Sequence, residues 1–170
     1  MPTRVPTRMP RRLGVALALA LLAGAGARAA DSGDKKPPYW ASIAAGKALM
    51  RTGPGRNYPA TWLYVRPDLP VKVIETYPNW RKVRDADGAT GWMLQRLLSD
   101  TRTGLVTGSE PRALHQEPDE HSPVTFRAEP GVVGRLSRCA GGWCMFDAKG
   151  RRGYIRVEHL WGLDASGTLG

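Results

Sequence analysis

The feature of this sequence that most constrains its fold is an internal repeat. The stretch NWRKVRDADGATGWMLQRLLS, residues 79–99, aligns with GWCMFDAKGRRGYIRVEHLWG, residues 142–162. A chain that repeats a segment of this kind is built from related structural units, each carrying its own copy of the pattern. We therefore predict two units, residues 39–101 and residues 111–164, with the polar stretch DTRTGLVTGSE between them as a short linker.

The alignment depends on matched aromatic, apolar and glycine positions. Upstream of the main match, KALMRTGPGRNYPA at 47–60 faces RALHQEPDEHSPVT at 112–125. The matched side chains in the main stretch are Trp80 and Trp143, Val83 and Phe146, Gly91 and Gly153, Trp92 and Tyr154, and Leu98 and Leu160.

Each unit has the composition of β-structure. Runs such as VKVIE and WRKV are rich in β-branched and aromatic residues and are bounded by Gly, Pro, Asn and Asp. DADGAT and DAKGRRG carry Asp and Gly where a tight hairpin needs a positive φ. Downstream of residue 29 no stretch sustains a helical pattern, although MLQRLLS can form one helical or 3₁₀ turn. We predict an all-β protein of two tandem, small five-stranded barrels.

The first 29 residues have the pattern of a cleaved signal peptide. MPTRVPTRMPRR carries four arginines and no acid, and the apolar run LGVALALALLAGAGA follows it. Ala27 and Ala29 satisfy the small-x-small rule of signal peptidase, which predicts cleavage before Ala30. The mature chain has no run approaching the roughly 20 apolar residues of a transmembrane helix. We therefore predict a periplasmic or secreted protein.

The charge of the mature chain favours anionic surroundings. The whole chain has 25 basic and 15 acidic residues, and the predicted signal peptide takes five of the basic ones and no acid. The remaining net charge of +5 suits cell-wall polymers or acidic lipid head groups. Nucleic acid is not a predicted partner, because an exported protein seldom meets it.

The two cysteines, Cys139 and Cys144 in CAGGWC, are predicted to form a disulfide. In an oxidising compartment such a pair joins more often than it binds metal, since two thiolates cannot complete a tetrahedral zinc site. The cluster HQEPDEH brings His115 and His121 near three carboxylates. Pro118 breaks any helix that would align these groups, so no metal is predicted.

The order of the motifs resembles the bacterial Src-homology-3-like (SH3b) pattern. ALMRTGPGRNYP, VKVIE, NWRKV and DGATGW follow its Arg-x-Gly-Pro loop, Val-rich strand, Asn-Trp-x-x-Val strand and Gly-Trp strand. The second unit, with CAGGWCMF, GRRGYI and HLWG, resembles a variant in exported proteins of α-proteobacteria, where two such units occur in tandem. Two departures stand out: EPDEHSP replaces the Gly-Pro-Gly loop, and the first unit lacks the cysteine pair.

The resemblance implies a five-stranded barrel with no catalytic apparatus and no cofactor. It also implies a ligand surface between two variable loops, which binds an envelope protein or a cell-wall peptide. The mature sequence contains no nucleophile elbow, phosphate-cradling glycine loop or paired carboxylates at a glycosidase-like position. A cysteine nucleophile with a histidine base remains conceivable chemistry, but the two cysteines are expected to pair.

Strand alternation predicts where the repeated aromatic residues point. Trp80 is three residues from the core candidate Val83, so it faces the opposite side of its strand, as does Trp143 relative to Phe146. On that outer face an aromatic ring can stack on a ligand, cover a neighbouring loop, or pack where the two barrels meet. Trp92 and Tyr154 are interpreted as core or groove-edge residues.

The loop after the first strand of the motif supplies the remaining candidates. Gly53 and Gly55 allow a sharp turn that brings Tyr58 toward Trp80, and a floor of Tyr and Trp flanked by arginines suits an anionic or proline-bearing peptide. A solvated turn is the alternative. The matching loop of the second unit is acidic, so the two units do not offer equivalent sites. The candidate ligand-binding residues are Arg51, Arg56, Tyr58, Trp80, Trp92, Trp143 and Tyr154.

Three functions follow from these features. The leading one is an exported, non-catalytic module that recognises a protein or a cell-wall peptide in the bacterial envelope. The first alternative is a structural envelope protein whose aromatic residues are used in packing between the barrels. The second is a cell-wall hydrolase or its accessory.

Overall fold

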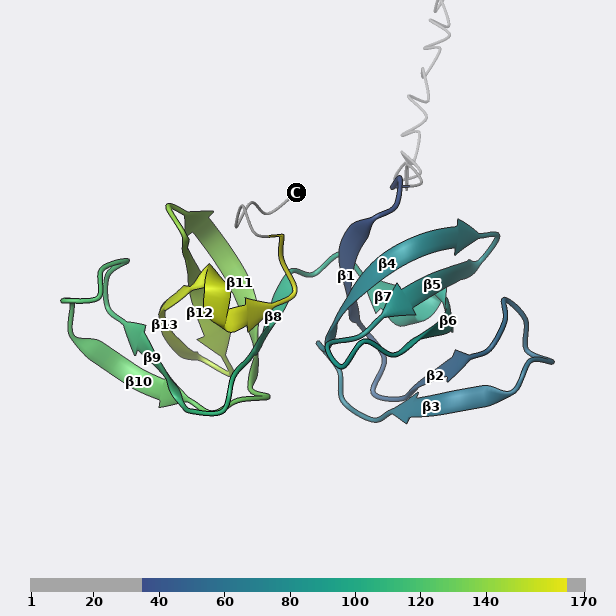
Figure 1. Ribbon diagram of the computed structural model, residues 1–170, viewed down its shortest axis with the longest axis horizontal. Helices are drawn as coiled ribbons and strands as arrows, with labels where there is room; N and C mark the ends of the chain where they lie inside the picture. Colours follow the sequence, from purple (N-terminus) through teal and green to yellow (C-terminus); the bar gives the residue numbers. More distant parts are fainter. Residues whose placement is uncertain (1–34, 165–170) are drawn as a thin grey trace, which may run out of the picture. The chain divides into compact units, whose positions relative to one another are not determined.

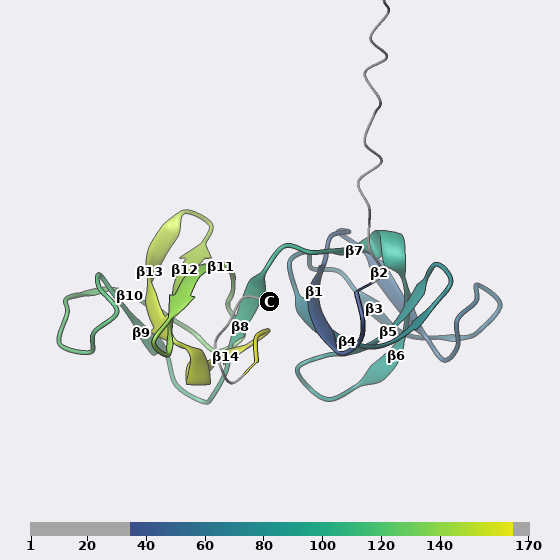
Figure 2. The ribbon, with the colours of Figure 1, turned by 90° about the horizontal axis from the view of Figure 1, so that it is seen from above.

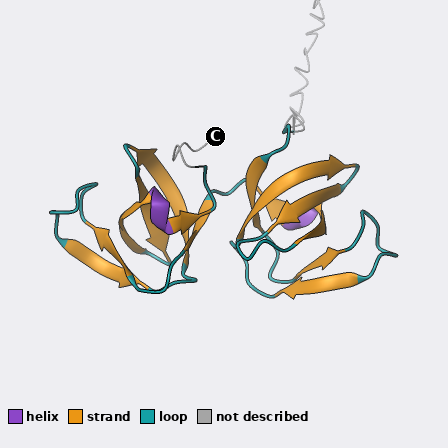
Figure 3. Cartoon of the chain, in the orientation of Figure 1, coloured by secondary structure: helices purple, strands orange, loops and turns teal. Residues whose placement is uncertain are grey.

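The computed structural model describes residues 35–164, which form fourteen strands and two three-residue 3₁₀ turns. The 3₁₀ turns are the only helical segments in this range (Figure 3). The predicted signal peptide lies outside the described residues. Neither turn has the length or apolarity needed to cross a membrane.

The first barrel, called domain 1 here, comprises β1–β7. Its strands follow the order β3-β2-β6-β5-β4-β1-β7 in one antiparallel sheet (Figure 1). The elements are β1 Tyr39–Ile43, β2 Ala48–Arg51, β3 Ala60–Tyr64, β4 Pro70–Tyr77, β5 Trp80–Arg84, β6 Thr90–Leu94, the 3₁₀ turn η1 Gln95–Leu97 and β7 Leu98–Ser99.

The second barrel, domain 2, comprises β8–β14 and repeats the same connections in the order β10-β9-β13-β12-β11-β8-β14 (Figure 2). Each sheet has seven strands rather than the predicted five, because the leading strand and the two-residue strand after the 3₁₀ turn also pair. The elements are β8 Thr103–Val106, β9 Arg112–His115, β10 Val124–Ala128, β11 Val133–Ala140, β12 Trp143–Ala148, β13 Arg151–Arg156, η2 Val157–His159 and β14 Leu160–Trp161.

Strand β8 corrects the predicted linker. Thr103–Val106 lies inside the stretch interpreted as polar, yet it pairs with β11 and β14 of domain 2. Its end residues Thr103 and Val106 are both buried. The strand was not recognised in the sequence because, among threonine and glycine, it contains only one core side chain. Domain 2 therefore begins before residue 111.

The repeat is confirmed by the pairing of strands β5–β6 and β12–β13. Trp80 lies opposite Leu94, and Trp143 lies opposite Arg156. The core residue Val83 pairs with a glycine, as its counterpart Phe146 does. Gly91 and Gly153 are required there, because an added Cβ would collide with Met50 or with Leu114 and Thr125.

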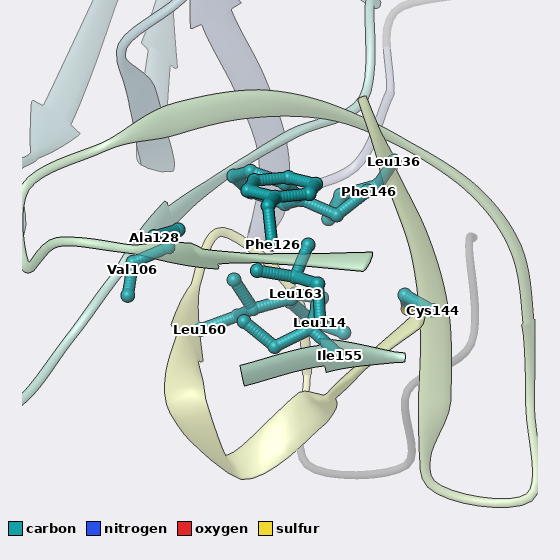
Figure 4. Close-up of a cluster of buried hydrophobic side chains, with 10 residues drawn as sticks. All are labelled: Val106, Leu114, Phe126, Ala128, Leu136, Cys144, Phe146, Ile155, Leu160 and Leu163. Carbon is teal, nitrogen blue, oxygen red and sulfur yellow. The ribbon is translucent and has the colours of Figure 1, made fainter. Parts of the chain in front are cut away.

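The domains have separate apolar cores. Val83 and Phe146 are fully buried in their respective cores, as strand alternation predicts, and neither Trp80 nor Trp143 belongs to a core cluster. The domain 2 core appears in Figure 4 and comprises Val106, Leu114, Phe126, Ala128, Leu136, Cys144, Phe146, Ile155, Leu160 and Leu163. The domain 1 core comprises Ala41, Ile43, Ala48, Met50, Val71, Val73, Val83 and Met93.

Aspartate side chains hold the predicted hairpin turns. The Oδ1 atom of Asp85 accepts hydrogen bonds from the backbone N–H groups of Asp87 and Ala89, and Gly88 has a φ of +86°. In domain 2, Asp147 accepts a hydrogen bond from the N–H of Gly150, whose φ is +89°. Positive φ at these glycines therefore matches the sequence-based expectation.

The predicted disulfide between Cys139 and Cys144 is present. It bridges the turn between β11 and β12, and Cys144 is fully buried in the domain 2 core. The bond therefore anchors this turn to the core of its own barrel.

Candidate functional site

Domain 1 carries a cleft on its outer face, above Trp80. Two adjoining hollows of 650 and 520 Å³ share Arg56, Trp80, Leu94 and Arg96. We call the combined surface the Trp80 cleft, and all its lining residues belong to domain 1. They are Lys47, Leu49, Arg51, Arg56, Leu63, Asn79, Trp80, Leu94, Gln95, Arg96, Leu97 and Leu98.

Strand alternation places Trp80 in this cleft. Trp80 faces away from the core residue Val83 and lies beside its pairing partner Leu94. Its side chain is only 7% exposed, so neighbouring side chains cover most of the ring. Trp80 therefore forms a largely covered apolar wall, not a free stacking platform.

The charge of the cleft is entirely positive. Lys47, Arg51, Arg56 and Arg96 line it, and no acidic residue does. Arg51 donates a hydrogen bond from Nη1 to the carbonyl oxygen of Tyr58 at 2.7 Å. Within residues 35–164, Lys47, Arg56 and Arg96 form no salt bridge. Cations grouped without acids raise the local concentration of anions.

The rim of the cleft is apolar and exposed. Leu49 pairs with Leu63 across β2 and β3, and Leu63 is 54% exposed. Six of the seven exposed large apolar residues in the described range belong to domain 1, and only Val124 belongs to domain 2. Of the six in domain 1, Leu49 and Leu63 line the cleft, and adjoining exposed apolar side chains of this kind are typical of an interaction surface. The six are Leu49, Tyr58, Trp62, Leu63, Val65 and Tyr77.

The expected floor of Tyr58 and Trp80 does not form. The Tyr58 ring lies against Gly53 and Gly55, where an added Cβ would collide with it. The loop turns back on itself because the N–H of Tyr58 donates to the carbonyl of Gly55. Tyr58 is therefore packed on its own loop, and it does not line the cleft, whereas Arg51 and Arg56 do.

Trp92 and Tyr154 lie outside both core clusters. Trp92 is buried beneath Lys82, whose Nζ is 5.8 Å from the ring centroid, and beside Tyr77, whose ring centroid is 6.3 Å away. Tyr154 is half-buried and pairs with Met145. Neither aromatic lines the Trp80 cleft, so the structure separates them from Trp80.

The loop between β9 and β10 repeats the loop between β2 and β3. Thr61 donates to the carbonyl of Met50, and Thr125 donates to the carbonyl of Leu114. These contacts make Met50 equivalent to Leu114, a correction of one residue to the upstream alignment derived from sequence, which matched Leu49 with Leu114. The misalignment arose because each segment contains an Ala-Leu pair, and matching these two pairs shifts the alignment by one residue.

The backbone hydrogen bonds of the two loops match in the corrected register. The bond from Gly55 N to Gly53 O corresponds to the bond from Asp119 N to Glu117 O. The bonds from Thr52 N to Pro59 O and from Tyr58 N to Gly55 O correspond to those from Gln116 N to Pro123 O and from Ser122 N to Asp119 O. In this shared conformation Arg56 is equivalent to Glu120.

In domain 2, side chains of the domain itself occupy the position that corresponds to the Trp80 cleft. Glu120 accepts hydrogen bonds from Nε and Nη2 of Arg156, at 3.0 and 2.6 Å. The Arg156 guanidinium lies 4.6 Å from the centroid of the Trp143 ring, and His115 packs edge-on against that ring at 5.6 Å. Hydrogen bonding to Arg156 lowers the pKa of Glu120 below its ordinary value. Trp143, 6% exposed, is thus covered by an internal ion pair.

Two positions of the cleft reverse their charge between the domains. Arg56 corresponds to Glu120, and Arg96 in η1 corresponds to Glu158 in η2. The apolar Leu63 corresponds to Arg127, and Leu94 corresponds to Arg156. The cleft surface thus has four cations and no acid in domain 1, against two arginines and two glutamates at the matching positions of domain 2.

The profile of the bacterial SH3 domain matches residues 44–100 and again residues 108–162. The chain belongs to the bacterial SH3 domain family. The two matches correspond to domain 1 and domain 2, so the protein is a tandem of SH3 domains. Its assignment to the α-proteobacterial type stays a prediction.

Solved structures with a similar arrangement are larger proteins. NlpC2 from Trichomonas vaginalis shares 14% identity over 78% of this chain and 52% of its own, with a TM-score of 0.34. NlpC1 from the same organism shares 14% identity over 76% and 47%, with a TM-score of 0.32. An NlpC/P60 family protein from Bacillus cereus shares 13% identity over 72% and 56%, with a TM-score of 0.33. The chain spans about half their length. No curated protein sequence matches it.

Other aromatic residues make the contacts between the two SH3 domains, which belong to one compact unit. The rings of Trp40 and Trp161 pack edge-to-face with centroids 4.9 Å apart. Trp40 and Lys72 donate hydrogen bonds to Asp164, and these bonds lower the pKa of the Asp164 carboxyl. Neither Trp80 nor Trp143 takes part in these contacts.

The histidine-rich loop of the second SH3 domain is organised by hydrogen bonds. The Oδ1 atom of Asp119 accepts from the backbone N–H of His121 and contacts its Nδ1 at 3.1 Å, and these bonds lower the pKa of Asp119. His115 Nδ1 lies 2.8 Å from the carbonyl oxygen of Ser122. Within residues 35–164, no group of three or more candidate ligands is arranged to hold a metal ion.

Sequence reasoning missed Arg96 and the leucines of the cleft. Arg96 follows the Gly-Trp strand in the 3₁₀ turn, and Leu63 lies on a strand whose pairing partner Leu49 is far away in sequence. The available signal was the alternation of β2: Leu49 and Arg51 flank the core residue Met50 and so share the opposite face.

Proposed function

We propose that domain 1 is a non-catalytic recognition module that binds a protein or a cell-wall peptide in the bacterial envelope. The Trp80 cleft is its contact surface. Membership of the bacterial SH3 domain family supports a binding role. The volume of the cleft, 650 Å³ in its larger part, falls within the range of ligand sites, about 300–1,000 Å³.

The main support for this proposal comes from the comparison between the two domains. Domain 1 leaves exposed the leucines and cations that surround its buried Trp80. Domain 2 covers the equivalent Trp143 with the ion pair of Arg156 and Glu120. A surface that one copy closes with its own side chains and the other leaves open is suited to an external partner.

Two features support location outside the cytoplasm and the absence of catalysis. The disulfide is the kind of bond that persists in oxidising compartments, and it agrees with the export signal expected from residues 1–29. Both cysteines of the chain are in this bond, so neither supplies a thiolate nucleophile.

The structural alternative assigned Trp80 and Trp143 to packing between barrels. Trp40 and Trp161 are the aromatic residues in contact between the domains. The exposure of Leu63 beside Trp80 therefore favours recognition over a purely structural role.

Co-sedimentation of the purified full chain with peptidoglycan sacculi, and capture on membrane-free envelope extracts, tests the proposal. Leu63→Glu places a charge on the cleft rim, and its matched control is Arg127→Glu at the equivalent position of domain 2. We expect Leu63→Glu to weaken binding about tenfold or more, because it replaces an apolar contact of the cleft with a charge. Binding by Leu63→Glu equal to that of the parent chain, or no binding by the parent, would refute the proposal.

A further inference from the structure

We infer that the ligand of the Trp80 cleft is an acidic peptide, whose carboxylate is received by Arg56 and Arg96 while an apolar neighbour contacts the leucines of the cleft. This inference rests on the proposed function, since it names the class of ligand for the same surface.

Domain 2 contains, between its own residues, a contact of a carboxylate with an arginine beside a tryptophan. There a loop carboxylate, Glu120, meets a guanidinium that lies on the face of Trp143. Charge-assisted bonds of this kind, with two guanidinium nitrogens on one carboxylate, are directional, and at an exposed position they add geometric specificity more than stability. Domain 2 thus has both partners of the ion pair beside its tryptophan.

Domain 1 has cations beside its tryptophan but lacks this ion pair, because Leu94 replaces Arg156. In the same loop conformation, Arg56 replaces the glutamate, and Arg96 replaces Glu158 in the adjoining 3₁₀ turn. Both arginines line the two hollows of the cleft beside Trp80. Both are exposed and form no salt bridge within residues 35–164. A carboxylate from another molecule therefore supplies the charge that domain 1 lacks.

The apolar part of the cleft selects a peptide over other anions. Leu49, Leu63 and Leu94 line the same hollow as Arg56 and Arg96. Single-stranded nucleic acid is bound in part through exposed aromatic rings on which bases stack, whereas Trp80, the aromatic residue among the described lining residues of the cleft, is only 7% exposed. In an extended peptide, a Glu or Asp two residues from a large apolar residue presents both side chains on the same face, toward the arginines and the leucines of the cleft.

Fluorescence anisotropy with the purified full chain tests the inference. The probes are a labelled peptide that repeats Leu-Leu-Glu-Glu, which places Leu and Glu on the same face of an extended chain, and the matched peptide that repeats Leu-Leu-Gln-Gln. We expect the acidic peptide to bind at least tenfold more tightly, with affinity that falls as salt is added. Arg56→Glu and Arg96→Glu, which install the charges of domain 2, are each expected to weaken binding at least tenfold. Glu120→Arg is the matched control in domain 2 and is expected to leave binding unchanged.

The other possible results either overturn the inference or distinguish its failure from that of the proposed function. Equal affinity for the two peptides overturns the inference, and so does loss of binding in Glu120→Arg with retention in Arg56→Glu. Competition by a single-stranded oligonucleotide as effective as the unlabelled acidic peptide also overturns it, in favour of a general polyanion site. If neither peptide binds while Leu63→Glu still abolishes binding to sacculi, the inference fails and the proposed function stands. If sacculi and extracts show no binding either, both fail.

Discussion

Domain 1 and domain 2 share a strand order, a loop conformation and the position of one tryptophan, yet their outer faces differ. In domain 2 the face is covered by Arg156 and Glu120. In domain 1 it is a basic cleft with exposed leucines. The inward residues of each strand therefore maintain the barrel fold, while the outward residues are free to differ between the domains.

A second pair of equivalent residues differs in exposure on the inward face of its strand, since Phe126 belongs to the domain 2 core and Trp62 lies opposite the core residue Met50. Trp62 in domain 1 is 58% exposed, whereas its counterpart Phe126 in domain 2 is 8% exposed. Arg151 covers the Phe126 ring at 4.5 Å from its centroid, and the equivalent position in domain 1 is Ala89. Domain 2 therefore covers its aromatic residues internally, and domain 1 leaves apolar surface available to a partner.

The largest expected effect concerns the two cores, which are separate clusters of buried residues. Phe146→Ala removes a fully buried ring and is expected to cost domain 2 about 3–5 kcal/mol of unfolding free energy. The matched Val83→Ala removes fewer atoms and should cost domain 1 less. Denaturant titration followed by amide NMR signals assigned to each domain measures both. Equal losses in both domains from either substitution would show a shared core.

The disulfide distinguishes domain 2 from domain 1 and gives the next largest effect. Replacing Cys139 and Cys144 by serine is expected to lower the unfolding free energy of domain 2 by about 2 kcal/mol, because a short loop in the unfolded chain is no longer closed. Denaturant titration of the double variant checks this, with the signals of domain 1 as the internal control. Unchanged stability of domain 2 would contradict the structural role of the bond.

Alkaline pH is expected to weaken domain 1 selectively. Burial, followed by the hydrogen bond from Tyr64 Oη to Asp85, raises the pKa of Tyr64 above its ordinary 10.0. A raised folded pKa contributes stability that is complete below pH 10.0 and is lost as pH rises through the folded value. The equivalent residue in domain 2 is Ala128, so domain 2 lacks this effect. Domain-resolved melting curves between pH 9 and 11 should show it, and Tyr64→Phe should remove it.

The smallest expected effect concerns the internal ion pair of domain 2. Because the folded pKa of Glu120 is lowered, its contact with Arg156 should persist as pH falls through 4.5, the ordinary value, and be lost only below it. The indole NMR resonance of Trp143 should then move, and in Glu120→Gln it should no longer follow this titration. A resonance that titrates identically in the parent and the variant would argue against the ion pair as the cover of Trp143.

The repeat, the hairpin turns and the direction of Trp80 and Trp143 were predictable from sequence. Each depends on local signals: Asp and Gly at the turns, and the two-residue period of a strand. Strand β8 was missed because Thr103–Val106 contains one core side chain among threonine and glycine. A strand with so few apolar residues shows no alternation of apolar and polar side chains, which is the signal that identifies a strand in sequence.

The membership of the cleft was not predictable, because barrel closure brings distant segments together. Leu63, Trp80 and Arg96 come from β3, β5 and the 3₁₀ turn. The place of Tyr58 also depended on three-dimensional detail, since its ring packs on the glycines of its own loop. The charge contrast between the two loops was visible in sequence, and the corrected register shows that it falls on equivalent residues, Arg56 and Glu120.

The claim that only domain 1 presents a ligand surface is tested most directly by the tryptophan indole resonances of the ¹⁵N-labelled full chain, titrated with the acidic peptide. We expect the Trp80 resonance to shift saturably while the Trp143 resonance stays in place. A saturable shift of Trp143 with an unmoved Trp80 would contradict it.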